Sequence, residues 1–541
     1  MYVVYNFSLA LPNAAGKRKT AVAGGLKVYK EKGGYEMRSK IAKKLLATSV
    51  LTAMTIGLVG CGEDAVTNEQ PTQAPAKDDP KPTEAPATPS TDEKEPEAPV
   101  VEDEPEVSPY TVKTDANGNA YDLGGMEVTI RDWWSPGDGL VETAMNAYDE
   151  ERLAFYDWMQ ETYNFTLVRK GISDWGSTPA DFLEYATTGG DENNYVFMQR
   201  ACTDFTQAVY SGLLYDLATL DCLDFSEEKW GAQVHTAYTL GDSIYAMAAE
   251  GAEPRQCVYF NKQVLKDAGI DPESLYDIQE NMQWTWDKFE ELCAQVTRDL
   301  DNDGVNDVWG YVGQAEEIYS AFVYSNGGEY VGQENGKFVY KLGDQATLDG
   351  LRKAVELNGK YLRQNEPDGP WDYFLPAFAA GNVAFFIDQA YRGQDQLAAA
   401  QADGAQFDWG VLCLPMGPNT TDYTNVYANN IAAIPAIYDA QRAWNIAFAY
   451  DCWYDPVPGY EDYDGWKSAY MKGYKDTESI DLTLARLKKN GKITFHDNVP
   501  NIQLGPDLFW KLGSYGAADE IAAAEEAIRE SWKAYIDEAN K

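Results

Sequence analysis

The chain has 541 residues, with 44 Lys and Arg against 86 Asp and Glu, so its formal net charge is −42. Hydrophobic residues at 44% and aromatic residues at 13% are enough to form large cores in two or three domains. The acidic balance argues against binding to nucleic acid or to anionic membrane surfaces, because like charges repel. There are only two histidines, His235 and His496, far apart in the chain, which argues against a zinc site or a histidine-based catalytic triad.

Residues 37–60 have the pattern of a signal peptide. A basic segment that ends at Lys44 precedes an apolar run too short to cross a bilayer comfortably. The run ends in Leu58-Val59-Gly60-Cys61, which resembles a bacterial lipobox. That resemblance implies diacylglyceryl transfer to the Cys61 sulfur and cleavage before this residue. We therefore expect a lipoprotein anchored by its acyl chains to the outer face of the cytoplasmic membrane.

A tether is expected to follow over residues 61–118. Between Gly62 and Pro109 there is no aromatic residue, Leu, Ile or Met, but there are ten prolines. Such a composition cannot bury enough apolar area to offset its chain entropy. The globular part is then residues 119–541, and residues 1–36 form an upstream extension that we expect to be absent from the mature protein, with translation starting at Met37.

Six cysteines remain once Cys61 carries the lipid. They are dispersed and fit buried thiols, while a disulfide between Cys202 and Cys222, the nearest pair in sequence, stays open.

The globular part begins with strands separated by helical stretches. Strand patterns cover Met126–Ile130, Phe165–Val168 and Tyr195–Met198, and a helical pattern covers roughly Glu142–Glu161. This order predicts an α/β fold, in which ligands bind beyond the carboxyl ends of the strands.

Three candidate ligand residues lie just past such strand ends: Trp133, Trp134 and Arg200. A tryptophan pair at this place offers large flat surfaces that can stack on the apolar face of a sugar ring. The alternative is that the two tryptophans pack in a core.

The stretch from Cys257 to Gly310 predicts a strand followed by two helices. The first helix is expected to close at Gly269, which tolerates positive φ. The second is expected to start after Thr285, whose hydroxyl can cap free backbone N–H groups. Its apolar residues fall on one face at helical spacing: Phe289, Leu292, Cys293 and Val296.

Four short motifs in this stretch occur in a specific order. They are Y-x-N-K at 259–262, A-G-I-D-P at 268–272, T-W-D-K-F at 285–289 and an acidic D-x-D-x-D-G loop at 299–304. This order resembles bacterial extracellular solute-binding protein family 1, the substrate-binding lipoproteins of sugar ABC transporters. The resemblance implies a two-lobed periplasmic-binding-protein-like fold of type II. In that fold each lobe is a mixed sheet flanked by helices, and the ligand cleft lies between the lobes.

The resemblance also divides the chain between the two lobes. Lobe 1 is expected at about 124–246 and 415–452, and lobe 2 at about 247–414 and 453–541. The hinges would be the crossings near 244–248 and 411–415.

Further motifs add expected ligand residues in the second half of the chain. Phe378–Tyr391 resembles the family's F-x-x-G-x-x-A-M pattern, which delivers polar and aromatic groups to the cleft. An amide pair precedes the strand Ile431–Pro435, and amides can both donate to and accept from sugar hydroxyls. The resemblance thus implies ligand contacts from Asp388, Gln389, Tyr391, Asn429 and Asn430.

The acidic loop has the spacing of the first part of an EF-hand. Its oxygen ligands would come from Asp299, Asp301, Asp303, the Val305 carbonyl and Asp307. Position 12 is Gly310 instead of the usual glutamate. We therefore expect a structural Ca²⁺ site, with a plain acidic turn as the alternative.

Two further elements complete the chain. Residues 451–494 are expected to form a helical, aromatic-rich insertion. The end of the chain is expected to form an amphipathic helix with one apolar face: Ile521, Ile528, Trp532, Tyr535 and Ile536.

The function expected from the sequence is capture of a carbohydrate, most simply an oligosaccharide, and its delivery to the permease subunits of an ABC importer. The protein would act as a monomer, without catalytic residues or a catalytic cofactor, its lobes closing around the ligand. Two alternatives stay open: a surface adhesin or sensor that binds glycans without transport, and a secreted glycosidase that uses paired carboxylates.

Overall fold

The computed structural model describes residues 110–541 except 232–236, 250–252, 367, 403, 428–429 and 513–517. The expected signal peptide, Cys61 and the tether up to Pro109 lie outside the described residues. Among the helices that are described, none is both long and apolar enough to cross a membrane.

The first lobe is built on a four-stranded sheet in the order β2-β1-β3-β13. Its strands are β1 (Met126–Asp132), β2 (Phe165–Gly171), β3 (Asn194–Arg200) and β13 (Asn430–Ala433). β1 runs parallel to both β2 and β3, whereas β13 is antiparallel to β3. The sheet is therefore mixed, and the carboxyl ends of β1, β2 and β3 share one edge with the amino end of β13.

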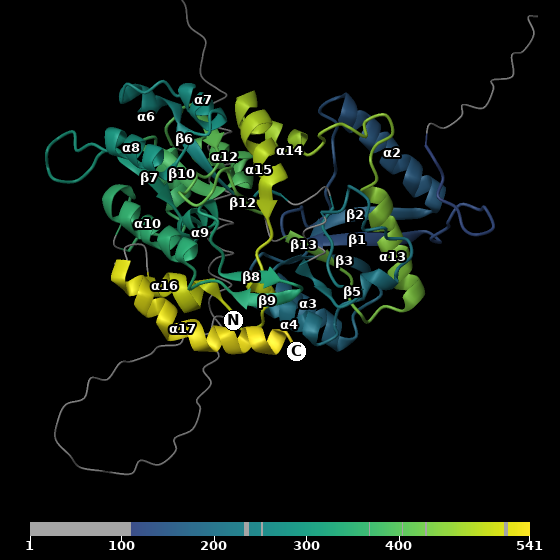
Figure 1. The fold of residues 1–541 in the computed structure, drawn as a ribbon. Helices are drawn as coiled ribbons and strands as arrows, with labels where there is room; N and C mark the ends of the chain where they lie inside the picture. The colour runs from purple at the N-terminus through teal and green to yellow at the C-terminus, as the bar shows by residue number, and fades with distance from the viewer. Residues whose placement is uncertain are drawn as a thin grey trace, which may run out of the picture. The chain divides into compact units, whose positions relative to one another are not determined.

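Helices pack on this sheet, with α2 and α13 visible beside it in Figure 1. They are α2 (Ala147–Tyr163), α3 (Thr178–Thr188), α4 (Thr203–Tyr210) and α13 (Ala440–Trp453). α2 starts five residues later than the sequence suggests, because the Asn146 side chain accepts from Asp149 N and caps the helix there. It ends at Asn164, which adopts a left-handed conformation.

The second lobe is built on another mixed sheet, in the order β11-β6-β10-β7. Its strands are β6 (Gln256–Asn261), β7 (Trp309–Gly313), β10 (Val383–Gln389) and β11 (Trp409–Leu412). β6 is antiparallel to both β10 and β11, and β10 is parallel to β7. The amino end of β6 therefore shares an edge with the carboxyl ends of β7, β10 and β11.

The helices of the second lobe include the two helices that the sequence predicts after β6. They are α6 (Lys262–Asp267), α7 (Ser274–Glu280), α8 (Trp286–Val296), α9 (Ala315–Ser325), α10 (Gln345–Tyr361), α11 (Phe374–Ala379) and α12 (Gln396–Ala402). The Thr285 hydroxyl accepts from Lys288 N and caps α8. Gly269 takes a φ of +78° after α6. All four predicted apolar residues of α8 are buried, so these predictions are confirmed.

Several short elements lie outside the two four-stranded sheets. They are η1 (Leu217–Thr219), β4 (Thr239–Leu240), β5 (Ser243–Ile244), β8 (Val331–Glu334), β9 (Lys337–Tyr340), η2 (Ala390–Gly393) and β12 (Asn425–Val426). β4 pairs with β5 and β8 with β9 as antiparallel hairpins.

Each lobe has its own hydrophobic core, and the cores show where the chain crosses. Met247 still belongs to the first core, and Cys257 is already in the second, so the first crossing lies close to the expected place. The return crossing does not. Met416 and Val426 belong to the second core, and Tyr427 already belongs to the first core again. The return therefore follows Val426, not 411–415, because β11 is a strand of the second sheet.

The chain after α13 also differs from the expected division. Val457 packs in the first core, so lobe 1 continues beyond residue 452, whereas Tyr470 packs in the second. The expected insertion is mostly helical: α14 (Lys467–Met471), η3 (Ser479–Leu484) and α15 (Ala485–Asn490), followed by β14 (Gly491–Lys492). β14 pairs with β12, which the sequence does not predict.

The end of the chain returns to the second core. Short turns η4 (His496–Asn498), η5 (Gly505–Phe509) and α16 (Trp510–Leu512) precede α17 (Ala518–Ala539). Four of the five predicted apolar residues of α17 are at most 5% exposed and Tyr535 packs against the same core, which confirms the amphipathic helix.

Residues 110–118, which the sequence assigns to the tether, are folded onto the first lobe. The Tyr110 ring lies 5.0 Å from that of Phe155 on α2, and Lys113 Nζ lies 2.6 Å from a carboxylate oxygen of Asp451 on α13. The folded part therefore begins by residue 110. The six cysteines of the described part are all free thiols, so Cys202 and Cys222 are not bridged.

Candidate functional site

The carboxyl edge of the first sheet presents two of the predicted tryptophans. β1 ends at Asp132, whose buried carboxylate accepts from the N–H groups of Trp134 and Ser135 at 3.2 and 2.9 Å. This turn holds Trp133 and Trp134 just past the strand, with ring centroids 4.7 Å apart and planes at 89°. Trp133 is half-buried and Trp134 is 46% exposed. Trp134 is thus outside the core and open to a ligand.

A third tryptophan, Trp175, lies at the same edge and was missed from the sequence. It follows the end of β2 and is 57% exposed. The Arg200 guanidinium, at the end of β3, lies 4.4 Å from the Trp175 ring centroid, and Arg200 Nε donates to the Trp175 carbonyl at 3.1 Å. The rule that selected Trp133, an aromatic residue just past a strand end, would have selected Trp175 too.

The expected amide pair is only partly described. Asn430 is half-buried at the start of β13 and lies opposite Arg200 in the pairing of β13 with β3. It therefore belongs to the same edge as the tryptophans. Asn429 lies outside the described residues.

The corresponding edge of the second sheet is built around a buried carboxylate that sequence reasoning missed. Glu317, in the first turn of α9, is 4% exposed. It accepts from Arg255 at 3.0 Å, Gln256 at 2.6 Å and Gln389 at 2.8 Å. Burial alone raises the pKa of Glu317, but Arg255 and the amide donors outweigh it and hold the pKa below its ordinary value. An acidic residue in the first turn of a helix is common, so sequence gave no signal of this role.

Asp388, a predicted ligand residue, is fully buried in the structure. Its Oδ1 accepts from Gln389 N at 2.6 Å and lies 3.5 Å from Arg392 Nε. Its Oδ2 has no hydrogen-bond partner among the described residues. Burial raises the pKa of Asp388 to about 6, with Arg392 opposing and Glu317 adding to the rise.

Tyr391 and Gln389 remain accessible at this edge, since both are half-buried. Arg392 lies between two rings, with its guanidinium carbon 5.2 Å from the Tyr391 centroid and 5.7 Å from that of Phe374. The second edge thus brings together Asp388, Gln389 and Tyr391 as the sequence predicts, but Asp388 contacts Arg392 instead of facing outward.

The acidic loop brings three of its five predicted ligand residues together. Carboxylate oxygens of Asp299, Asp301 and Asp307 lie within 4.8 Å of one another. Asp303 instead accepts from Val305 N at 2.8 Å. Backbone pairing of Arg298 with Val308 closes the loop.

Gly310 explains why the loop lacks the final EF-hand glutamate. It lies in β7, where a Cβ would come within 2.8 Å of the Tyr361 Cβ. No larger side chain fits at this position, so position 12 cannot supply a ligand to the loop.

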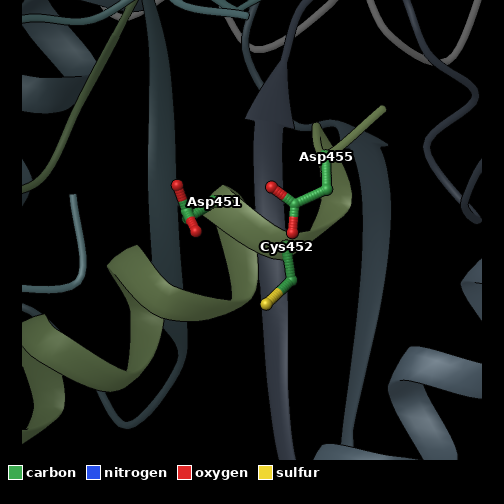
Figure 2. Close-up of side chains that lie close together, drawn as sticks. All are labelled: Asp451, Cys452 and Asp455. Atoms are coloured by element: carbon green, nitrogen blue, oxygen red, sulfur yellow. The ribbon is translucent and has the colours of Figure 1, made fainter. Parts of the chain in front are cut away.

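A second cluster with metal-like spacing lies at the end of α13: Asp451, Cys452 and Asp455 (Figure 2). Lysines already neutralise its carboxylates. Lys113 lies 2.6 and 2.8 Å from Asp451 and Asp455, and Lys229 lies 2.7 Å from Asp451. Burial lowers the pKa of Lys229, but the two aspartates outweigh it and raise the pKa overall. The cluster is an ion-pair network that joins Lys113 and Lys229 to the end of α13.

The first lobe also has a surface pocket of about 240 Å³ between α2, β2 and Trp453. Its charged lining residue Glu142 is paired with Arg152 and lies 3.7 Å from Arg169. None of the predicted site residues lines this pocket.

The solved structures that share the fold of this chain include two with bound ligands. UgpB from Mycobacterium tuberculosis, in complex with glycerophosphocholine, is 17% identical, with a TM-score of 0.51 over 76% of this chain and 98% of its own. The ABC substrate-binding protein Lmo0181 from Listeria monocytogenes, in complex with cycloalternan, is 14% identical, with a TM-score of 0.52 over 75% and 99%. Together with the two mixed sheets and two cores, they define a two-lobed periplasmic-binding-protein fold, as the sequence predicts.

The sequence itself also matches a known family over part of its length. Residues 205–449 match the family model of the bacterial extracellular solute-binding proteins. Over this segment the chain is similar to that family, in agreement with the resemblance of the motifs between Tyr259 and Gly304. No curated protein sequence matches the chain.

Proposed function

We propose that this protein captures a carbohydrate, most simply an oligosaccharide, between its two lobes and delivers it to the transmembrane subunits of an ABC importer. The observation that carries the proposal is the exposed aromatic surface at the carboxyl edge of the first sheet, where Trp134 follows β1 and Trp175 stacks on Arg200, the residue opposite Asn430. Aromatic faces bury the apolar side of sugar rings, and amide and guanidinium groups pair with hydroxyls. The site needs no reacting group, because capture and delivery change no covalent bond.

The two similar solved structures hold ligands of different chemical classes. One holds cycloalternan, a carbohydrate, and the other holds glycerophosphocholine. Fold alone does not decide between such ligands. The tryptophans at the first edge favour the carbohydrate, and the net charge of −42 disfavours a polyanionic one.

A thermal-shift screen tests this proposal. Neutral gluco-, xylo- and mannooligosaccharides, short peptides, amines and glycerophosphocholine would each be added to the protein at equal concentrations. We expect an oligosaccharide to raise the midpoint of unfolding, because a ligand that binds only the folded state stabilises it. Stabilisation by a peptide, an amine or glycerophosphocholine, with none by any saccharide, would contradict the carbohydrate proposal.

Two further experiments separate binding from catalysis and transport from adhesion. Chromatography of the bound oligosaccharide after long incubation should return it intact, whereas shortened products would indicate a glycosidase. Loss of oligosaccharide uptake in cells that lack the protein, with restoration by the intact gene, is expected for an importer and not for an adhesin or sensor.

Anchoring rests on Cys61 and is part of the proposal. The lipid-bearing protein would stay on the outer face of the cytoplasmic membrane, with the segment before Tyr110 as its tether and one copy acting alone. We expect Cys61→Ser to release the protein into the medium while leaving its ligand affinity unchanged. Retention of the variant in the membrane fraction would contradict lipid anchoring.

We also propose that the acidic loop binds Ca²⁺ as a structural ion. The donor set fits in part: it offers hard oxygens from Asp299, Asp301 and Asp307, with the Val305 carbonyl nearby in sequence. The ion would hold these carboxylates together and stiffen the connection between α8 and β7. Calcium should raise the midpoint of unfolding and EDTA should reverse it, and Asp299→Asn should abolish the response. An unchanged midpoint with calcium would leave the loop as an acidic turn.

A further inference from the structure

Trp175 is held in an ordered turn between β2 and α3. The Asp174 carboxylate accepts from the N–H groups of Gly176 and Ser177 at 2.8 and 2.9 Å. The Asp174 carbonyl also accepts from Thr178 N at 3.0 Å, so the turn leads directly into α3. The backbone around Trp175 is therefore fixed, and its indole does not have to be ordered when a ligand arrives.

Arg200 covers one face of the indole and leaves the other open. Its guanidinium carbon lies 4.4 Å from the ring centroid, and its Nε donates to the carbonyl of Trp175 itself. This second contact fixes the guanidinium against the ring. A tryptophan stacked on one face yet 57% exposed must present most of its other face to solvent. By contrast, Trp230 in the core of the same lobe is 2% exposed.

The open face belongs to the edge at which the predicted ligand residues gather. The N–H of Ile172, in the loop that carries Trp175, donates to the carbonyl of Asp132 at 3.1 Å, which ties this loop to the end of β1 and the turn that holds Trp134. Arg200 ends β3 and lies opposite Asn430. Trp175 is therefore part of the same surface as Trp134, not a separate patch.

We propose that Trp175 is a stacking subsite for one pyranose ring of the ligand and that Arg200 is a positioning residue that holds the indole in place. This inference rests on the proposed carbohydrate function and names one of its contacts. A flat ring with one face supported and the other exposed suits the apolar C–H face of a sugar.

The test compares variants of Trp175 by calorimetry with the tightest-binding member of the oligosaccharide panel. Trp175→Ala should weaken binding at least tenfold, and Trp175→Phe, which keeps an aromatic face, should stay within about threefold of the parent. Both should unfold at the parent midpoint, because the exposed ring adds little to the core.

Arg200→Ala tests positioning separately. It should weaken binding about three- to tenfold. It should also increase acrylamide quenching of the Trp175 contribution to the fluorescence, taken as the difference between proteins with and without Trp175→Phe, a change that a residue with only an electrostatic role would not produce. Arg442→Ala is the matched control. Arg442 also stacks on an aromatic ring, with its guanidinium carbon 4.1 Å from the Tyr438 centroid, and it donates to the Asn194 side chain at the opposite end of β3. The Arg442→Ala variant should bind the oligosaccharide as tightly as the parent does.

The outcomes distinguish the two proposals. If the parent binds an oligosaccharide and Trp175→Ala binds it equally well, the stacking subsite is overturned and the carbohydrate function stands. If the parent binds no saccharide, both the stacking subsite and the carbohydrate function are contradicted. If Arg200→Ala and Arg442→Ala weaken binding equally, the positioning role of Arg200 is overturned.

Discussion

Each lobe presents one sheet edge at an equivalent place, but the two edges differ in the exposure and hydrogen bonding of their side chains. At the first edge Trp134 and Trp175 are about half exposed, so a ligand can contact them as the structure stands. At the second edge Glu317 and Asp388 are buried, and Glu317 is bound to Arg255 and two amides. The first edge offers exposed aromatic surface, whereas the second is a buried polar network in which Asp388 Oδ2 lacks a hydrogen bond, with half-buried Tyr391 and Gln389 at its margin.

This difference assigns different tasks to the two lobes. An exposed aromatic ring gains free energy when a sugar ring covers it, since apolar area leaves water on both partners. A buried carboxylate that already has its hydrogen bonds gains little from a ligand and loses much if it is left unpaired. We therefore expect the first edge to determine ligand affinity and the second edge to determine the stability of its lobe.

Removing the centre of the second network should have the largest effect. Glu317→Ala leaves Arg255, whose side chain is 26% exposed, and two amides without their buried carboxylate, which is expected to cost about 3 kcal/mol of unfolding free energy. Urea denaturation followed by circular dichroism measures this cost. The neighbouring Glu316→Ala, which loses only a hydrogen bond from Trp510, should cost about 1 kcal/mol. Equal costs for the two variants would break the contrast between the edges.

The pH dependence of Asp388 sharpens the same contrast. Burial raises its pKa from 3.8 to about 6, so between these pH values the folded protein holds a proton that the unfolded chain has lost. Stability from this group is therefore lost as the pH rises through that window. Asp388→Asn cannot titrate, so its stability relative to the parent should rise by about 2 kcal/mol between pH 4 and pH 7.

Urea denaturation of parent and variant at the two pH values measures this difference. Exposed Asp138, changed to Asn, serves as the control and should show no such change. A constant difference between Asp388→Asn and the parent at both pH values would mean that the carboxylate is not buried in the folded protein.

The first edge should respond in the opposite way. Trp134→Ala should weaken oligosaccharide binding about tenfold, which corresponds to about 1.4 kcal/mol. Its effect on unfolding should stay within about 0.5 kcal/mol, because the ring is 46% exposed. Calorimetry measures the affinity. Val141→Ala, an 85% exposed apolar residue of the same lobe, should leave affinity unchanged. A loss of stability without a loss of affinity would mean that Trp134 serves the core.

Much of the fold could be predicted from local signals. The cap at Thr285, the turn at Gly269 and the apolar face of α8 each depend on residues a few positions apart, which a sequence displays directly. The place of the return crossing could not be predicted from the sequence, because a buried run such as Trp409–Leu412 does not reveal which of the two cores it enters. Pairing with β6 decides this, and that pairing joins segments about 150 residues apart.

The candidate site was predictable to a similar extent. Strand ends pointed to Trp133, Trp134 and Arg200, and the structure places all three at one edge. Burial of the Asp388 side chain was not predictable. A strand that is buried on both faces has no alternation of apolar and polar residues, so its sequence does not show where a polar side chain points. The partners of Glu317 come from β6 and β10, so its role depends on tertiary packing.

The central claim, carbohydrate capture at the first edge, is tested most directly by calorimetric titration of the protein with the neutral oligosaccharide that gives the largest thermal shift. We predict saturable binding of one ligand per chain, with the affinity reduced at least tenfold in the double variant Trp134→Ala, Trp175→Ala. Saturable binding that the double variant retains in full would place the ligand elsewhere and contradict the account.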